Sequence, residues 1–179
     1  MKHQDIDIRS RQAPLRKRYK KEPDAAWVTD RARTIGENPT DPFHGIVEPG
    51  SEDHGAVWSF GVHRGVGGPH DAPVPGDILC AALAACLDST IRIVAQHLRI
   101  RFKALEVEVT GEADLRGTLL VDPEVPVGFQ KMRCSIRIKP AEDTEPRVLK
   151  KLIEAAEHSC VVMQTLRSGV SVETNVDLQ

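Results

Sequence analysis

The amino-acid sequence predicts a single α+β domain, and three observations lead to this prediction. Residues 104–115 and 131–140 alternate apolar with charged side chains, which is typical of half-buried strands. Residues 77–98 repeat leucine, isoleucine and valine along one face of a helix. Strands, a long helix, further strands, a helix and a last strand follow one another within 179 residues, which suits one mixed domain of ordinary size.

The segments before the long helix are predicted to be strands and loops. We expect one strand within "AAWVTDRART" (25–34) and two more in "HGIVEPG" and "AVWSFGVH", joined by turn residues 50–55. Glycine and proline supply seven of the fourteen residues 64–77, which predicts an irregular loop. Asp77 is the expected N-cap of the long, largely buried helix.

The two strands after the long helix carry opposite charges on their outer faces. Glu106 and Glu108 lie on the outer face of the first strand, and Arg133 and Arg137 lie on that of the second. Charges of opposite sign on neighbouring strands attract across a sheet, so we expect these faces to pair.

The last third of the chain is predicted to hold two helices and a strand. A helix is expected to start near Pro146, because proline suits the first helical turn. A shorter helix is expected to end at Gly169, and the alternating "VSVETNVDL" is expected to close the chain as a strand.

Charge is distributed unevenly along the chain. The net charge of −2 argues against bulk attraction to nucleic acid or to an anionic membrane. Residues 1–21, however, carry eight lysines or arginines against Asp5 and Asp7. We interpret this basic N-terminal arm as a solvated, partly disordered terminus rather than an RNA-binding or protein-binding segment.

The sequence predicts a cytoplasmic protein. No apolar h-region follows the basic start, and the apolar run Ile78 to Leu87 is half the length of about 20 residues that a bilayer span requires. The four cysteines at positions 80, 86, 134 and 160 therefore point to packing, metal binding or redox chemistry rather than to a disulfide scaffold.

Several common kinds of site find no support in the sequence. Zinc sites use clustered pairs of ligands, whereas His158 and Cys160 stand two apart and the other histidines are scattered. "GVGGPH" lacks the lysine and hydroxyl residue of a phosphate-binding loop, and no G-x-S-x-G motif is present. We therefore expect neither a metal nor a cofactor.

The cysteines separate into two groups. Cys80 falls within the apolar stripe of the long helix and Cys134 on the inner face of a strand, so packing is the simplest role for both. Cys86 lies about 120° around the helix from Cys80, at the margin of the stripe, so the two cannot pair. Cys160 lies where one helix ends and another begins, a position that favours a thiolate. Periodicity alone leaves open whether Cys86 and Cys160 are functional.

Three longer stretches resemble the OsmC/Ohr family of thiol peroxidases. They are "PGDILCAALAACLDSTIR", "LEVEVTGEADLRGTLLVDPEVPVGFQKM" and "AAEHSCVVMQTLRSGVSVET". The resemblance covers about residues 75–176 and continues more weakly into the strands from about residue 25. It rests on Ala-Ala-Cys in an alanine-rich helix and on a distant Glu-x-x-Cys-x-Val followed by Thr-Leu and Gly-Val. The 74 residues between Cys86 and Cys160 also suit the family.

The resemblance implies a fold, an assembly and an activity. Antiparallel sheets would wrap around two long central helices in an intertwined homodimer, with residues 22–179 as the family domain and 1–21 as an arm that is disordered or swapped between subunits. Cys86 would be the peroxidatic cysteine and Cys160 the resolving one. The substrate would be an alkyl or lipid hydroperoxide, and an external dithiol would be the reductant.

The chain departs from the family pattern around the expected thiolate. The family commonly has a glutamate ten residues before the first cysteine, where this chain has Gly76 with Asp77 beside it. The loop "IGENPTDPFHG", where the family usually keeps an activating arginine, contains none, so Arg33 or Arg64 is the candidate substitute or an ordinary surface charge. The alternative function is a non-catalytic family member that binds a small apolar ligand or senses oxidants through its cysteines.

Overall fold

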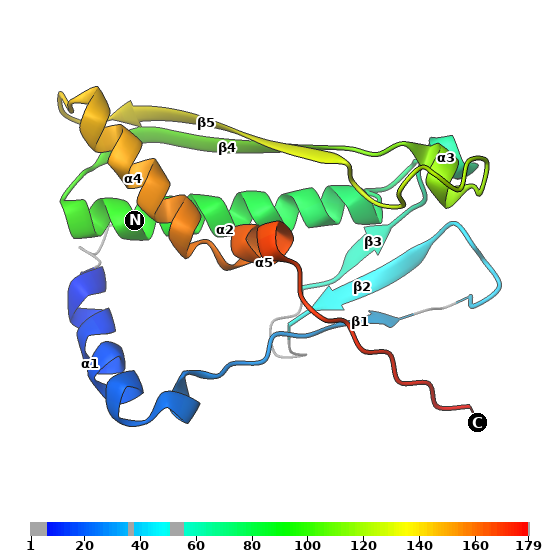
Figure 1. Cartoon of the computed structure of the whole chain (residues 1–179), viewed down its shortest axis with the longest axis horizontal. Coiled ribbons are helices and arrows are strands. Elements are labelled where there is room, and N and C mark those ends of the chain that lie inside the picture. Colours follow the sequence, from blue (N-terminus) through cyan, green and yellow to red (C-terminus); the bar gives the residue numbers. More distant parts are fainter. Residues whose placement is uncertain (1–6, 36–37, 51–55, 179) are drawn as a thin grey trace. The chain divides into compact units, whose positions relative to one another are not determined.

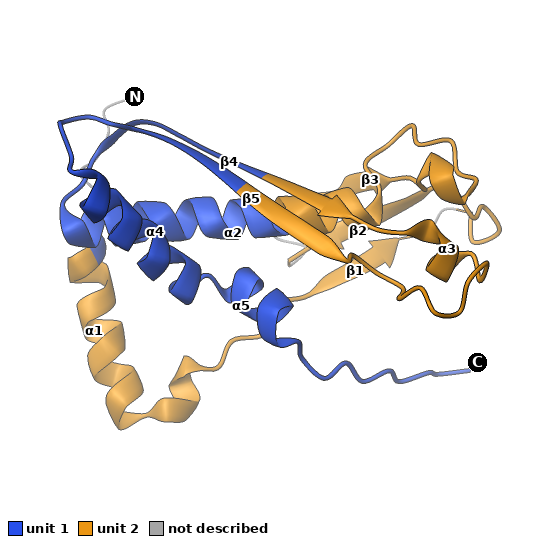
Figure 2. Ribbon diagram, turned by 45° about the horizontal axis from the view of Figure 1, so that its top comes forward, with its two compact units in different colours: residues 1–8, 82–108, 135–179 blue, residues 9–81, 109–134 orange. Residues whose placement is uncertain are grey.

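The structure is a computed structural model of the chain, and it describes residues 7–35, 38–50 and 56–178. The chain divides into two compact units, which Figure 2 colours separately. Unit 1 comprises residues 1–8, 82–108 and 135–179, and unit 2 comprises residues 9–81 and 109–134. Helices occur together with antiparallel strands, as Figure 1 shows, and the predicted α+β class is confirmed.

Unit 2 holds a three-stranded antiparallel sheet in the order β1-β2-β3. Its strands are β1 (Ala32–Ile35), β2 (Gly45–Pro49) and β3 (Trp58–Phe60). Strands β2 and β3 confirm the two strands predicted in "HGIVEPG" and "AVWSFGVH". Of the turn expected between them, residues 51–55 lie outside the described residues.

The strand predicted within residues 25–34 begins only at Ala32. Pro23–Ala26 form a short 3₁₀ helix instead, because the ring of Pro23 fixes its φ angle and leaves no N–H for a ladder. Trp27 follows with extended backbone angles but outside any strand, and its side chain is 85% exposed. An alternating pattern becomes a strand only where a partner strand is available, and of the predicted segment and its continuation β2 pairs with Ala32–Ile35.

The long helix α2 spans Pro75–Leu98 and begins two residues earlier than predicted. Pro75 occupies the first helical position, where the missing N–H costs no hydrogen bond. Asp77 is therefore not the N-cap: its carboxylate lies in the first turn and accepts a hydrogen bond of 3.0 Å from the N–H of Val74. The loop before α2 is irregular, as predicted, with a 3₁₀ turn at Arg64–Val66.

Unit 1 holds the main apolar core. Helix α4 (Pro146–Ser159) lies across α2 in both ribbon views, and the shorter helix α5 (Val161–Ser168) follows it (Figures 1 and 2). These two helices confirm the predicted pair. The buried side chains from the three helices and the α4–α5 junction are Leu83, Leu87, Ile91, Ala95, Leu152, Ala156, Cys160 and Met163.

Burial of α2 within one chain is less complete than predicted. The centre of the predicted stripe is buried, but its ends are exposed, with Leu79 at 37% and Leu98 at 47%. Among the described residues, α2 is the one helix long and apolar enough to cross a membrane, a test that the core helix of a soluble protein also passes. Asp88 and Arg92 form an ion pair of 2.7 Å on this helix.

Strands β4 (Phe102–Glu112) and β5 (Lys131–Pro140) pair as the second sheet. The predicted charge pairing between their outer faces is confirmed, because Arg137 forms ion pairs with Glu106 at 2.8 Å and with Glu108 at 3.2 Å. Side chains along β5 alternate strictly between exposed and half-buried, as the sequence pattern predicts.

The last predicted strand is wrong for this single chain. Residues 169–178 are extended, but they form no strand, and the side chains of Val170, Val172 and Val176 are 65%, 84% and 74% exposed. Alternating apolar and polar side chains make a segment suitable for a sheet, but the strand forms only when a neighbouring edge supplies its hydrogen bonds.

Part of the basic arm is helical, whereas we expected it to be partly disordered. Helix α1 spans Ile8–Lys21, and residues 1–6 lie outside the described residues. Arginine, lysine, glutamine, leucine and alanine are all good helix formers, which explains the helix. Its first amide, that of Ile8, donates to Oε1 of Gln96 at 3.2 Å.

Replacing Leu87 by alanine should strongly destabilise unit 1. The Leu87 side chain is fully buried, so Leu87→Ala removes buried methyl groups and leaves a cavity, lowering the free energy of unfolding by about 2–5 kcal/mol. Leu120→Ala is the control, since that side chain is 87% exposed, and it should change stability by less than about 0.5 kcal/mol. Urea denaturation measures both, and equal effects would contradict this core assignment.

Candidate functional site

Cys86 lies in the middle of α2, between the buried residues Leu83 and Leu87. Its thiol is half-buried. The Cys86 carbonyl oxygen accepts hydrogen bonds from the hydroxyl groups of Ser89, at 3.0 Å, and Thr90, at 2.7 Å. These hydroxyl groups give the backbone at Cys86 polar partners from the following turn of the same helix.

Cys160 occupies the junction at which α4 ends and α5 begins. Its φ and ψ angles of −79° and 108° are those of an extended residue, and it serves as the C-cap of α4 and the N-cap of α5. Gln164 fixes this junction, because its backbone N–H donates to the Cys160 carbonyl at 2.9 Å and its side-chain Nε2 donates to the Glu157 carbonyl at 2.8 Å. The Cys160 side chain is fully buried.

The structure places the Cys86 thiol close enough to Cys160 to raise the pKa of the Cys160 thiol. Both residues belong to unit 1, one from α2 and the other from the α4–α5 junction. Both thiols are free, so the pair is in its reduced form. Two thiols in contact can exchange a proton, and after oxidation of one sulfur they can form a disulfide.

Burial is the main cause that raises the pKa of the Cys160 thiol. The neighbouring Cys86 sulfur raises that pKa further, whereas the backbone amides of Met163 and Val162 lower it. The Cys160 side chain makes no capping hydrogen bond to α5. An interaction that raises the pKa of Cys160 favours its protonated form.

The other two cysteines do not join this pair. Cys80 is half-buried, and burial together with the negative charge of Asp77 raises the pKa of its thiol. Cys134 is half-buried on β5. Neither forms a disulfide, and both positions fit the packing role predicted for them, although neither side chain is fully buried.

The three candidate activating residues, Arg33, Arg64 and Asp77, all belong to unit 2. Arg64 lies exposed in the 3₁₀ turn before α2, and the Asp77 carboxylate is used within the first turn of that helix. A carboxylate disfavours a nearby thiolate, as Cys80 shows, so Asp77 could activate a thiol only by positioning a cation.

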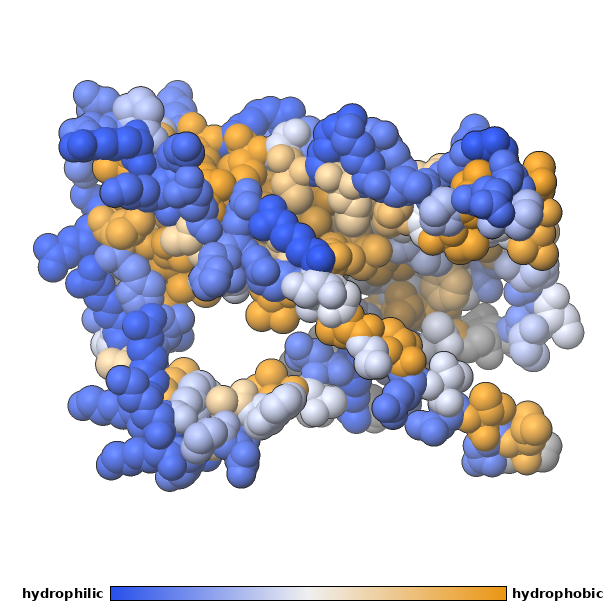
Figure 3. Space-filling view, viewed as in Figure 1, coloured by the Kyte–Doolittle hydropathy of each residue, from blue (hydrophilic) through white to orange (hydrophobic). Residues whose placement is uncertain are grey.

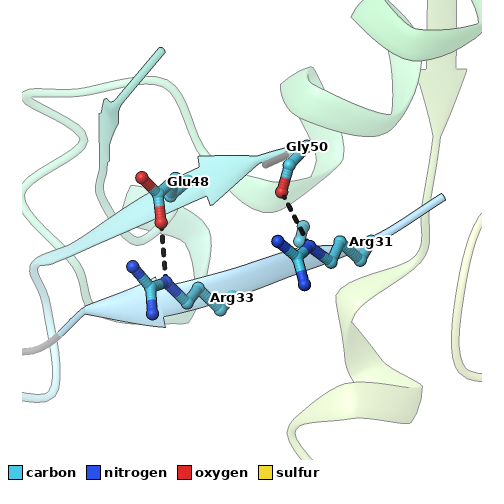
Figure 4. A pocket seen from close by; sticks show the side chains of 5 residues that line it. Arg31, Arg33, Glu48 and Gly50 are labelled. Atoms are coloured by element: carbon cyan, nitrogen blue, oxygen red, sulfur yellow. Dashed lines mark hydrogen bonds and ion pairs between the residues drawn. The ribbon is translucent and has the colours of Figure 1, made fainter. Parts of the chain in front are cut away.

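Arg33 is held by a carboxylate that the sequence analysis missed. Its Nε donates to Oε2 of Glu48 at 2.6 Å, across the β1–β2 register, and the Glu48 side chain is buried (Figure 4). Glu48 was detectable as the one charged residue in the apolar strand "GIVEP", because a buried charge requires a partner.

Arg33 and Glu48 line a cavity of about 260 Å³ on the β1–β2 ladder. Arg31, Ala32 and Gly50 complete its walls, and Figure 4 shows the Arg31 guanidinium beside Gly50. The Arg31 Nε donates to the Gly50 carbonyl at 3.4 Å. The cavity therefore presents two guanidinium groups and one carboxylate within unit 2.

Replacing Cys160 by serine should reduce the loss of stability at alkaline pH. An unfolded cysteine ionises near pH 8.5, whereas burial raises the pKa of folded Cys160 above its ordinary value of 9.0. Above pH 8.5 the unfolded chain therefore binds fewer protons than the folded chain, and stability falls as pH rises through the folded pKa. Cys160→Ser cannot ionise, so its free energy of unfolding should fall less steeply. Urea denaturation under reducing conditions from pH 7 to 10 tests this, and equal slopes would contradict it.

Comparisons with known proteins place the chain in a family. The family model described as OsmC-like protein matches residues 68–175. An organic hydroperoxide resistance protein OsmC from Legionella pneumophila is 23% identical, with a TM-score of 0.58 over 83% of this chain and 96% of that one. No curated protein is significantly similar in sequence to the chain.

Two further solved structures have the same fold. An OsmC-like protein of unknown function from Vibrio cholerae is 12% identical, with a TM-score of 0.64 over 78% of this chain and 94% of that one. An organic hydroperoxide resistance protein from Elizabethkingia anophelis is 18% identical, with a TM-score of 0.58 over 80% and 91%. Identities this low show the fold alone, but the family model covers more than half of the sequence, and the chain therefore belongs to the OsmC-like family.

Proposed function

We propose that the protein is a thiol-dependent peroxidase that reduces organic hydroperoxides, with Cys86 as the peroxidatic cysteine and Cys160 as the resolving cysteine. The observation that carries the proposal is the contact between these two thiols. It is supported by membership of the OsmC-like family and by structural neighbours named organic hydroperoxide resistance proteins.

The first chemical step is attack by the Cys86 thiolate on the terminal oxygen of a hydroperoxide, ROOH. The S–O bond forms as the O–O bond breaks, the alkoxide takes a proton to leave as the alcohol ROH, and Cys86 becomes a sulfenic acid. Sulfur is oxidised by two electrons, and the peroxide is reduced by two.

The second step joins the two cysteines. The Cys160 sulfur attacks the sulfenic sulfur, the S–O bond breaks, and the hydroxyl group leaves as water after taking a proton. An external dithiol then reduces the disulfide by thiol–disulfide exchange and returns both thiols. Because Cys160 is fully buried, this step requires its thiol to lose a proton against a raised pKa.

The surroundings of the pair favour organic rather than inorganic peroxides. Leu83 and Leu87 flank Cys86 along α2, and Met163 is buried in the first turns of α5. Apolar walls bind an alkyl group more strongly than they bind water or hydrogen peroxide. We therefore assign alkyl or lipid hydroperoxides as the substrate class. We also propose the cytoplasm, the location expected from the sequence, as the site of action.

Arg33, Arg64 and Asp77 stay candidates for activating Cys86. Arg33 is the strongest of the three because the buried Glu48 carboxylate fixes its guanidinium. A fixed cation stabilises a thiolate better than a mobile one, since it loses less conformational freedom on pairing.

The alternative function is an oxidant sensor or ligand-binding member of the family without turnover. The raised pKa of Cys160 favours it, since a protonated resolving thiol attacks slowly and would let the Cys86 sulfenic acid persist. A sensor needs such a lifetime, whereas an efficient peroxidase does not.

Peroxide consumption with cumene hydroperoxide and dihydrolipoamide tests the proposal. The wild-type chain should consume many equivalents, Cys86→Ser should consume none above the uncatalysed rate, and Cys160→Ser should stop after about one equivalent per chain. Cys80→Ser and Cys134→Ser are matched controls that should retain turnover, because the proposed mechanism uses neither thiol.

A wild-type rate no faster than that of Cys86→Ser would contradict the peroxidase. A single equivalent consumed by the wild type, with a sulfenic acid that a dimedone probe traps for minutes, would instead support the sensor.

We also propose that the protein is a homodimer. A single chain leaves the ends of the α2 stripe exposed, and it leaves the alternating valines of residues 169–178 without a strand partner. Exposed apolar surface on this scale is typical of an interface. A second copy would cover it.

Sedimentation equilibrium should give a mass of twice 19.7 kDa at micromolar concentration. Val172→Asp with Val176→Asp should shift the equilibrium toward the monomer, because two carboxylates would have to be desolvated at the interface. A wild-type monomer at these concentrations would contradict the dimer.

A further inference from the structure

Helix α1 concentrates positive charge to a degree found in no other helix of the described chain. Seven of its fourteen residues are lysine or arginine, none is acidic, and none is buried. The basic residues are Arg9, Arg11, Arg16, Lys17, Arg18, Lys20 and Lys21. In Figure 3 hydrophilic side chains cover the visible face of this helix.

The cations surround most of the helix instead of forming one stripe. At 100° per residue they span about 220° of the circumference. The remaining arc contains Ile8, Gln12, Leu15 and Tyr19. A flat surface can contact only about half of a helix, whereas a groove between two charged walls can contact cations on several sides. The distribution of charge therefore suits a grooved polyanion.

The helix is electrostatically strained without a counterion. Arg16 and Lys20, and likewise Lys17 and Lys21, stand four residues apart, a spacing at which like charges destabilise a helix. Pro14 removes a further backbone hydrogen bond from its interior. Arg18 pairs with Glu22 at 3.3 Å, just beyond the last turn. A polyanion that neutralises these charges would therefore stabilise α1 as it binds.

We propose that α1 binds the phosphate backbone of double-stranded nucleic acid without sequence specificity. Fourteen helical residues extend about 21 Å, and a duplex presents one phosphate per about 3.4 Å along each strand over that length. Regular, closely spaced charge of this kind can pair with cations on both sides of the helix. The helix has no side-chain amide on the cationic arc, so that arc lacks the group that reads adenine, and we assign its arginines and lysines to phosphate contacts.

A membrane is a poorer partner for the same helix. Its apolar arc has three apolar side chains, and Ile8 and Tyr19 are already half-buried in this chain. A helix that lies in a membrane interface needs a broad apolar face, which α1 does not have.

The net charge of −2 does not prevent this binding. Acidic residues elsewhere in the chain outweigh the cations of α1, but salt screens charges that lie more than about 8 Å away at physiological ionic strength. A phosphate in contact with α1 therefore experiences mainly the local cations. The net charge correctly predicts weak bulk attraction, but it does not describe this exposed helix.

Fluorescence anisotropy with a labelled 20-base-pair DNA duplex of random sequence tests the proposal on the full chain. Affinity should fall as sodium chloride rises from 50 to 200 mM, by about 10³-fold if six of the cations contact phosphate. The triple variant Lys17→Gln, Lys20→Gln, Lys21→Gln should bind more weakly and reduce the slope of log K against log salt by about 2 to 3. Amide hydrogen exchange within α1 should also slow on binding.

The matched control is Lys131→Gln, Lys150→Gln, Lys151→Gln, which makes the same change in net charge at exposed positions outside α1. It should leave the salt slope within about 1 of the wild type. Equal losses in both triple variants would overturn the assignment to α1. Absence of duplex binding at 50 mM salt, or α1-dependent binding to phosphatidylserine vesicles but not to the duplex, would overturn the assignment to nucleic acid.

Discussion

The contact between the Cys86 and Cys160 thiols depends on the junction at which α4 ends and α5 begins. Cys160 is extended there, between two helices, and the side chain and backbone of Gln164 fix the turn. Leu87 on α2 and Leu152 on α4 are both fully buried, so moving the two helices apart would expose apolar side chains to water, and this cost holds the junction in place. The proposed chemistry therefore rests on the apolar core of unit 1. Burial that holds the two sulfurs in contact also raises the pKa of the Cys160 thiol, so stability and reactivity oppose each other at this residue.

Much of the fold could be predicted because its sequence patterns reflect interactions between neighbouring residues and neighbouring strands. The alternation of β4 and β5, the charge pairing of Arg137 with Glu106, and the proline that starts α4 all follow from nearest-neighbour rules. The failures share a cause: the strand at residues 25–34 and the one at 170–178 depended on partners elsewhere in space. Neither pattern shows whether a pairing edge exists, and among the described residues the C-terminal segment forms no strand.

The candidate site was predictable in its nucleophiles but not in its electrostatics. Cys86 and Cys160 could be selected by their place at a stripe margin and a helix boundary, together with a family motif. Their proximity could not be predicted from the sequence, because the two residues stand 74 positions apart and helix packing sets the distance between them. Glu48 was missed because its importance comes from the register that places it opposite Arg33, and register depends on strand pairing.

Mass spectrometry after one equivalent of cumene hydroperoxide tests the central claim most directly. Peptide mapping with fragment-ion sequencing of the alkylated, non-reduced protein would show which cysteines have joined, and the fragment ions would distinguish Cys86 from Cys80, six residues away on α2. A thiol pair already in contact should give an intramolecular Cys86–Cys160 disulfide as the main product, with Cys80 and Cys134 still free to be alkylated. A main product in which Cys160 stays reduced, or in which Cys86 joins a different cysteine, would contradict the two-cysteine account.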